Sequence, residues 1–236
     1  MPENYRSHLL HLIEHPSIHG VVVHQNNSIN LIMKAIGLIL MGAHSTGIQL
    51  LKNSLKNRST LNDLLIKKAK KLNKHIYIDR SLNGIEFKRW IDLHKIDVLI
   101  NMRTREIFKP HILNAPRLGC INVHHGLLPE QRGTMCDLWS LINNQKAGFS
   151  IHLMKEKIDD GEIILTHHVS SPSKSYQEYL EKTMQEELNI INNLLDDICK
   201  RNALPQTSPN PSVNAVYYKT PKIKDIYQLK RKGITL

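Results

Sequence analysis

Residues 120–129 read CINVHHGLLP, and the rest of the chain is interpreted outward from this stretch. Its first five residues alternate between apolar and polar side chains, which is the pattern of a half-buried strand. Gly126 and Pro129 then indicate a loop directly after the strand. Asn122 and His124 are two residues apart, so both side chains point to the same face at the strand's carboxyl end. In an open α/β sheet, ligands bind at this end of the strands.

Helices and strands are predicted to alternate on both sides of this stretch. Strands are expected at 20–23, 75–78, 98–100, 149–153 and 162–165, and helices at 5–13, 60–72, 85–93, 138–142 and 176–198. Asn83 is expected to cap the third of these helices and Ser175 the last. The alternation predicts an α/β fold with an open, mostly parallel twisted sheet and helices on both faces, as in Rossmann-like proteins.

Composition indicates one domain that buries its own core. The chain has 236 residues, of which 41% are hydrophobic. Its three cysteines form no close pair, so we expect neither a disulfide framework nor a thiolate metal site. The first residues do not resemble a secretory signal, and a cytoplasmic location is expected. We assign residues 1–203 to the catalytic domain and 204–236 to a Pro- and Ser-containing linker and a basic tail.

Two features invite other interpretations. The net charge of +11 could indicate nucleic-acid binding, but the clustered lysines lack interleaved aromatic residues, and solvated helix faces explain them better. The apolar stretch 31–51 is long enough to span a bilayer, yet Lys34, His44 and Gln49 interrupt it. A buried or interfacial helix is therefore favoured, and no membrane span is expected.

An acidic turn, Asp159-Asp160-Gly161, lies between two of the expected later strands. A carboxylate beside an imidazole raises the pKa of the imidazole and fixes its orientation. Taken singly, a strand-end histidine or an Asp-Gly turn is more often structural than catalytic. Only their combination with Asn122 predicts a functional site.

Residues 122–129, with Arg132-Gly133 after them, resemble the formyltransferase signature Asn-x-His-x-Ser-Leu-Leu-Pro followed by Arg-Gly. Residues 159–164 resemble the family's second element, Asp-x-Gly followed by an apolar strand. The resemblance covers roughly residues 75–170. Within the signature, Gly126 stands where the family has serine, and we expect this glycine to ease the tight turn.

The resemblance implies a catalytic triad of Asn122, His124 and Asp159. Asp159 stands two residues before the glycine, as the family motif requires, although counting from Asn122 alone could favour Asp160. When an amine attacks a formyl carbon, negative charge develops on the formyl oxygen and a proton leaves the nitrogen. Asn122 and His124 can donate hydrogen bonds to that oxygen, and His124 with Asp159 can relay the proton.

The formyl donor implied by the resemblance is 10-formyltetrahydrofolate, held by two loops. One follows the strand at 98–100 and the other leads to the Asp-x-Gly element; their expected folate-binding residues are Met102, Arg103, Thr104, Arg105, Ile107, Met154, Ile158 and Asp160. No metal is expected, because the histidines show no helical His-Glu or His-Asp ligand spacing.

The acceptor is expected to be a small-molecule amine, with a nucleotide-linked amino sugar favoured. Methionyl-tRNA formyltransferases add a C-terminal β-barrel for which residues 204–236 are too few, so a tRNA acceptor is disfavoured. Three alternatives stay open: a methionyl-tRNA formyltransferase-like enzyme, a formyltetrahydrofolate hydrolase, and an inactive folate- or nucleotide-binding relative.

The family's fold begins with a strand and its following loop, whereas this sequence starts in what we expect to be the first helix. We therefore expect the family's first strand to be absent from these residues. A start codon further upstream, another segment in its place, or a decayed and inactive relative would each account for its absence.

Overall fold

A computed structural model describes residues 3–24, 36–37, 39, 48, 51–52, 59–102, 104, 106–170 and 175–235. The expected helix at 31–51 lies almost entirely outside these residues. The chain divides into two compact units, one formed by residues 9–82 and the other by residues 1–8 with 83–236. The domain boundary expected at residue 203 stays a prediction.

No helix within the described ranges is both long enough and apolar enough to cross a membrane.

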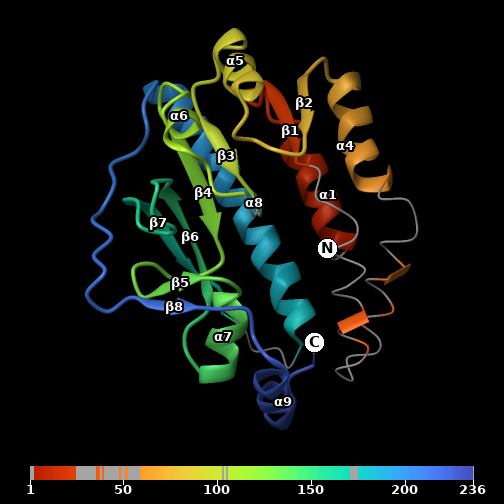
Figure 1. Cartoon of the computed structure of the whole chain (residues 1–236), viewed down its shortest axis with the longest axis vertical. Helices are drawn as coiled ribbons and strands as arrows, with labels where there is room; N and C mark the ends of the chain where they lie inside the picture. Colours follow the sequence, from red (N-terminus) through yellow and green to blue (C-terminus); the bar gives the residue numbers. More distant parts are fainter. Residues whose placement is uncertain are drawn as a thin grey trace. The chain divides into compact units, whose positions relative to one another are not determined.

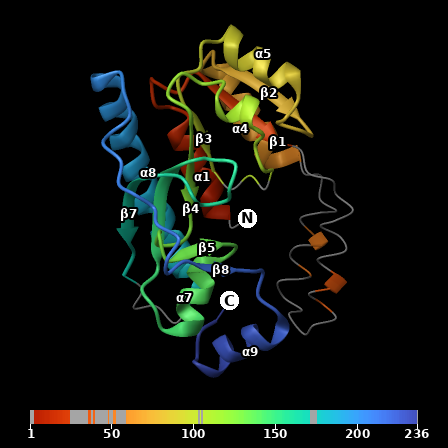
Figure 2. The ribbon, with the colours of Figure 1, turned by 60° about the vertical axis from the view of Figure 1, so that its left-hand side comes forward.

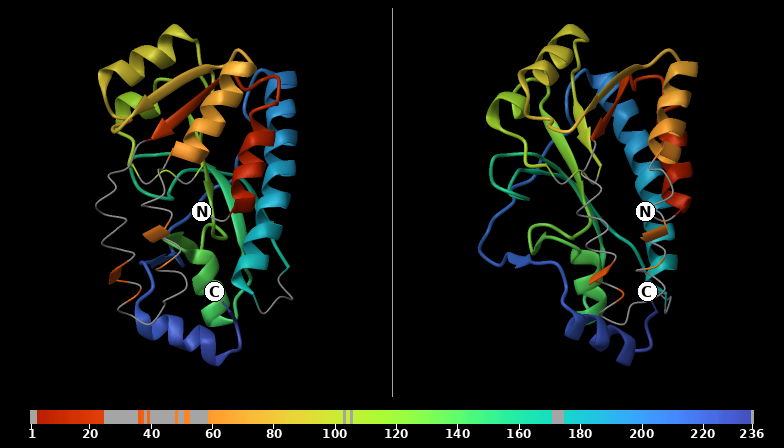
Figure 3. Two further views of the ribbon diagram at one scale, coloured as in Figure 1. Left: turned by 90° about the vertical axis from the view of Figure 1, so that its right-hand side faces the viewer. Right: turned by 45° about the vertical axis from the view of Figure 1, so that its right-hand side comes forward.

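The smaller unit contains two parallel strands, β1 (Gly20–His24) and β2 (His75–Asp79), in the register Val22↔Tyr77. Helix α4 (Ser59–Lys71) contacts both strands (Figure 3). The β-branched run Val21–Val23 within β1 suits this parallel pairing. Among the described residues, β1 pairs only with β2, and the absence of the family's first strand stays a prediction.

The larger unit contains a four-stranded sheet in the order β3-β4-β6-β7 (Figure 1). Its strands are β3 (Leu99–Asn101), β4 (Cys120–His124), β6 (Gly148–Leu153) and β7 (Ile163–His168). β3 and β4 are parallel, whereas β6 is antiparallel to β4, and β7 to β6. A further parallel pair joins β5 (Gln131–Gly133) to β8 (Val216–Tyr218). The predicted α/β class is confirmed, with mixed pairing: three of the five strand pairs among the described residues are parallel.

The helices of this unit follow the predicted pattern with one correction. α8 (Tyr176–Arg201) contacts β6, and the Ser175 hydroxyl accepts a hydrogen bond from the Glu178 N–H (3.3 Å), as expected of its cap. The prediction that Asn83 caps α5 (Ile85–Leu93) is wrong, because Gly84 is the N-cap. The Asn83 amide instead donates to the Ile107 carbonyl (2.9 Å), since its side chain reaches the loop after β3. Three further helices are α1 (Glu3–Leu12), which spans the boundary between the units, α6 (Pro110–Leu113) and α7 (Cys136–Asn143).

Residues 204–236 are more structured than a linker and tail. They contain β8 and a final helix, α9 (Ile223–Arg231), which contacts α7 (Figure 2). Leu229 of α9 is fully buried and packs with Leu138 and Ile142 of α7. Burying such side chains supplies the free energy that orders this segment.

Candidate active site

Three polar side chains form a row across the sheet. Asn101 of β3 and His152 of β6 lie in register on either side of Asn122 of β4. Asn101 Nδ2 donates to Asn122 Oδ1 (2.7 Å), and Asn122 Nδ2 lies 3.1 Å from His152 Nε2. His152 Nδ1 must carry a hydrogen, because it contacts the Leu153 carbonyl (2.7 Å). Its Nε2 can therefore accept from Asn122, whose other N–H has no partner among the described residues.

His124 is buried two residues further along β4. Its Nε2 donates to the Gln131 carbonyl (2.7 Å), because a carbonyl can only accept. In the neutral imidazole, Nδ1 is then the unprotonated nitrogen, and it lies 3.6 Å from Asp159 Oδ1. Burial lowers the pKa of His124 below its ordinary value, although the Asp159 charge and the Gln131 hydrogen bond act in the opposite direction. The neutral form is therefore favoured near pH 7.

Asp159 reaches this point from the loop between β6 and β7. Its Oδ2 accepts from the Gly133 N–H (2.8 Å), and its Oδ1 lies 3.6 Å from His152 Nε2. Burial by itself would raise the pKa of Asp159, but the nearby imidazoles of His152 and His124 and the Gly133 hydrogen bond outweigh it and lower the pKa. Asp159 is thus an ionised carboxylate beside the buried imidazole.

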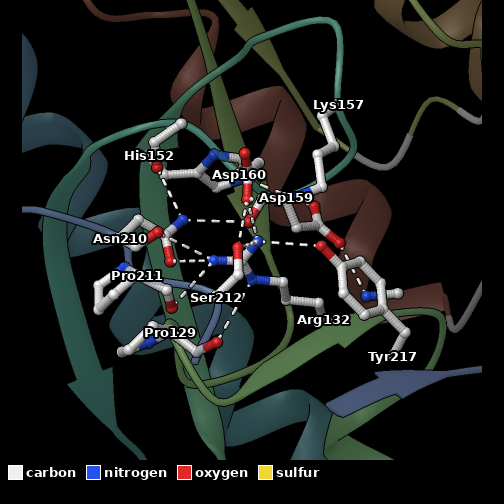
Figure 4. Close-up of polar contacts among 12 residues, drawn as sticks. Pro129, Arg132, His152, Lys157, Asp159, Asp160, Asn210, Pro211, Ser212 and Tyr217 are labelled. Carbon is white, nitrogen blue, oxygen red and sulfur yellow. Dashed lines mark hydrogen bonds and ion pairs between the residues drawn. The ribbon is translucent and has the colours of Figure 1, made fainter. Parts of the chain in front are cut away.

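Asp160, the alternative acid of the triad, points elsewhere (Figure 4). Its carboxylate forms an ion pair with Arg132 and accepts from Ser212 Oγ (3.0 Å) and Lys157 Nζ (3.2 Å). Burial would raise the pKa of Asp160, but the hydrogen bonds from these three partners lower it. The two adjacent carboxylates therefore have different neighbours, and only Asp159 faces His124.

Gly126 makes room for the imidazole. A Cβ atom added at this position would lie 2.5 Å from His124 Nε2 and 2.8 Å from both Cys136 Cβ and the Gln131 carbonyl oxygen. We expected the glycine to ease the tight turn, but its φ is not in the left-handed region. A glycine is needed here because there is no room for a side chain: any Cβ would collide with the His124 ring in its present position.

The loop after β4 is held from the neighbouring strand. Ser150 of β6 lies opposite His124 in the register, and its hydroxyl donates to the Gly126 carbonyl (2.8 Å) and accepts from the Leu128 N–H (2.9 Å). On the loop's other side, His125 Nε2 lies 3.0 Å from the buried Glu187 carboxylate of α8. These contacts fix the turn that follows His124.

The residues expected to bind folate lie on the two loops that follow the flanking strands. Met102 and Thr104 follow β3, and Met154 directly follows β6; the Thr104 N–H donates to Asn101 Oδ1 (3.2 Å). Ile107 and Ile158 are 58% and 49% exposed, so each loop presents an apolar side chain to the solvent. Arg103 and Arg105 lie outside the described residues. Asp160 is on the second loop, but its side chain is bound by Arg132.

Several side chains around the triad were not predicted. His152 and Asn101 each sit on a strand beside Asn122, and their alternation with apolar neighbours was a usable signal. Gln131 and Asn210 gave no such signal, because their positions depend on how loops close over the sheet. Among the described residues, no group of three or more His, Cys, Asp or Glu side chains is arranged to hold a metal ion.

Comparison with known proteins identifies the family and similar folds. The family described as formyl transferase matches residues 39–195. Over 75 residues, covering 31% of the chain, the sequence is 37% identical to GDP-perosamine N-formyltransferase of Brucella melitensis and 40% identical to methionyl-tRNA formyltransferase of Clostridioides difficile. The formyltransferase PseJ from Anoxybacillus kamchatkensis, solved with UDP-4,6-dideoxy-4-formamido-L-AltNAc and tetrahydrofolate, has a similar fold. It aligns with a TM-score of 0.50 at 20% identity, over 66% of this chain and 80% of that one.

The family match identifies the class of protein as a one-carbon group transferase. The chain belongs to the formyl transferase family, because that family's match covers more than half of its residues. The matched part spans less than a third of the two curated relatives, 29% of the first and 24% of the second.

Proposed function

We propose that this chain transfers a formyl group from 10-formyltetrahydrofolate to a primary amine on a small molecule, such as a nucleotide-linked amino sugar. The observation that supports this most strongly is a buried His124 paired with an ionised Asp159, next to the Asn122 amide. A hydrogen-bond donor and a proton acceptor side by side are what attack of an amine on a formyl carbon requires.

Asn122 would stabilise the charge that develops on the formyl oxygen. Its amide orientation is fixed from both sides, by Asn101 at Oδ1 and by His152 at Nδ2. A donor held in place before the reaction stabilises an oxyanion without reorganisation. The remaining N–H of Asn122 is the donor we assign to this task.

His124 would accept the proton that leaves the attacking amine. Its Nε2–H is committed to Gln131, so Nδ1 is the nitrogen that can take a proton. The imidazolium formed in this way would be stabilised by Asp159, whose carboxylate lies 3.6 Å from Nδ1. Burial increases the strength of that charge interaction.

The two loops beside the triad are suited to a folate. Folate presents a flat ring with polar edges, which binds between apolar side chains and main-chain hydrogen-bonding groups. Exposed Ile107 and Ile158, one on each loop, would supply apolar surface, and the described residues of the two loops would supply main-chain groups. These loops are the proposed donor site, with the same residues as expected from the sequence; Asp160 would contribute its main chain.

The acceptor class is the less constrained part of the proposal. An amino sugar is supported by the names of the Brucella relative and of the ligand bound to PseJ. A tRNA acceptor is the second candidate, supported by the similarity to methionyl-tRNA formyltransferase and by the net charge of +11. A formyltetrahydrofolate hydrolase would use water in place of the amine.

The test is a formyl-transfer assay on the full chain with 10-formyltetrahydrofolate. Acceptors should include a panel of nucleotide-linked amino sugars and methionyl-tRNA, and release of free formate should be followed in parallel. We expect a formylated amino sugar that forms only when both substrates are present. Formate release without transfer would favour the hydrolase. A failure to bind the folate at all would contradict the proposal.

A further inference from the structure

We infer that Asn210 is a positioning residue of the proposed reaction, which holds the main chain of Asp159 so that its carboxylate faces His124. The inference rests on the proposed function, and it adds to the site a segment that follows α8. Asn210 lies 51 residues after Asp159 in the sequence, beyond the region matched by the family.

The Asn210 amide contacts both sides of the turn that carries the acid. Its Nδ2 donates to the Asp159 carbonyl (3.0 Å) and to the Gly161 carbonyl (2.8 Å). Its Oδ1 accepts from Arg132 Nη2 (2.8 Å). The amide can have only this orientation, because a flipped amide would place its oxygen against two carbonyls and its NH₂ group against a guanidinium.

The Asp159–Gly161 turn has a backbone conformation that contacts from outside the turn must stabilise. Asp159 has a φ of +53°, in the left-handed region that side chains other than glycine rarely adopt. The two hydrogen bonds from Asn210 hold this residue at its own carbonyl and the turn two residues later at the Gly161 carbonyl. They stabilise the conformation in which the carboxylate meets His124 and the Gly133 N–H together.

Arg132 fixes Asn210 in turn. Its guanidinium is fully buried and binds groups from the loop after β4, from the Asp159–Gly161 turn and from the segment after α8 (Figure 4). Its partners are Pro129 O, Asp160, Ser212 Oγ, Tyr217 OH, Asn210 O, Asn210 Oδ1 and Pro211 O. A buried guanidinium with most of its donors satisfied is a rigid anchor, because moving it would leave a charge unpaired.

The segment that carries Asn210 is also tied to the sheet. Ser208 and Ile163 of β7 exchange two main-chain hydrogen bonds, of 2.8 and 2.9 Å. Asn210 therefore extends from a point fixed on β7 toward the turn that precedes that strand. Asp159 is held by a residue 51 positions away on a loop segment, whereas Asn122 is held by Asn101 and His152 on the neighbouring strands.

The variant that isolates this role is Asn210→Asp. It keeps the shape of the side chain and an oxygen facing Arg132, but it replaces both donors to the Asp159 turn with an acceptor. Ser208→Ala is the matched control, because it removes a hydroxyl from the same segment and leaves the main-chain bonds to Ile163 intact. Both full-length proteins should be assayed for formyl transfer across a range of pH, with thermal unfolding measured alongside.

We expect Asn210→Asp to lower kcat by roughly ten- to a hundredfold, because small displacements of a catalytic group have effects of this size. The acid limb of its pH–rate profile should also move, whereas KM for the acceptor should change less than about threefold. Ser208→Ala should match the wild type in kcat, in the pH–rate profile and in KM. Asn210→Ala, which removes the same two donors without adding a charge, should reproduce the loss of kcat.

A wild-type kcat and pH profile in folded Asn210→Asp would overturn the inference while leaving the proposed function intact. Loss of cooperative unfolding in both Asn210 variants would also overturn it, because Asn210 would then support the whole unit rather than Asp159. An inactive wild-type chain would instead be a failure of the proposed function.

Discussion

The two sides of the candidate active site are held in place by different means. Asn122 and His124 belong to β4, which pairs with β3 on one side and with β6 on the other. Asp159 belongs to a loop and is held by Gly133, by Asn210 and through the Arg132 network. The strand side is built from contacts between sheet neighbours, and the loop side from contacts between residues 26 to 51 positions apart.

The positions of the catalytic side chains are therefore fixed in two different ways. Strand pairing fixes the direction of every second side chain, so the Asn-x-His spacing alone places both groups on one face. A loop residue has no such constraint, and its position depends on a buried polar network that must be satisfied as a whole. The strand side should therefore tolerate substitutions around it better than the loop side.

The largest effects should come from the strand side itself. Asn122→Ala should lower kcat by about a hundred- to a thousandfold, the range for loss of one oxyanion donor. His124→Ala should lower it by about a hundred- to ten-thousandfold, the range for loss of a proton acceptor. Both variants should keep the unfolding transition of the wild type within a few degrees, because the β4 ladder is unchanged. Steady-state formyl-transfer assays measure kcat, and thermal unfolding measures stability. Turnover within threefold of wild type would remove these residues from the chemistry.

On the loop side, Asp159→Asn should be much more damaging than Asp160→Asn. Asp159 stabilises the protonated His124 and raises its pKa, so removing the charge lowers that pKa further. Activity that needs neutral His124 should then persist to a lower pH. The acid limb of the pH–rate profile should therefore lie at a lower pH than in the wild type. Asp160→Asn should mainly reduce stability, because it leaves buried Arg132 without its carboxylate. A reversed order in kcat would make Asp160 the acid of the triad.

A smaller effect is expected where the strand ends. Gly126→Ala should lower kcat by about tenfold and reduce stability by roughly 1–3 kcal/mol, because the added methyl group must displace the His124 ring or the neighbouring backbone. Gly84→Ala is the control, since its Cβ would meet no atom within 4 Å. Equal behaviour of the two variants in urea unfolding and turnover would show that His124 has more freedom than its contacts indicate.

The pH dependence of stability should show the smallest effect. The pKa of His124 is lowered in the folded state, so below its ordinary value of 6.5 the unfolded chain binds more protons. This contribution to stability is present above pH 6.5 and is lost as the pH falls through the folded-state pKa. Urea unfolding between pH 7.5 and 5 should therefore show a shallower decline for His124→Gln than for the wild type. Identical slopes would mean that His124 is not buried in its neutral form.

Sequence reasoning predicted the strand side well, because strand and helix periods are local signals. The bounds expected for β4 are those of the structure, and Ser175 caps α8 as its spacing with Glu178 indicated. The Asn83 cap failed because that side chain is used in a contact with the loop after β3, which no local pattern indicates. Propensity is a weak prior wherever a tertiary contact competes with it.

The loop side could be predicted only through a family resemblance. Asp159 and Asp160 are adjacent and chemically identical, and their roles differ only because Arg132 lies beside one of them and His124 beside the other. Residues 204–236 were expected to be a linker and a tail because proline, serine and lysine predominate there. The apolar contact of Leu229 with α7 and the polar contacts of Asn210 were too far apart in sequence to be seen.

The central claim is that the strand side and the loop side form one catalytic centre, and a double-mutant cycle of His124→Ala and Asp159→Asn tests it most directly. Residues that act as a unit have non-additive effects on turnover. The formyl-transfer rate of the double variant should therefore be no more than about threefold below that of His124→Ala alone. A rate reduced by the product of the two single effects would mean that the two residues act independently, and would contradict the account.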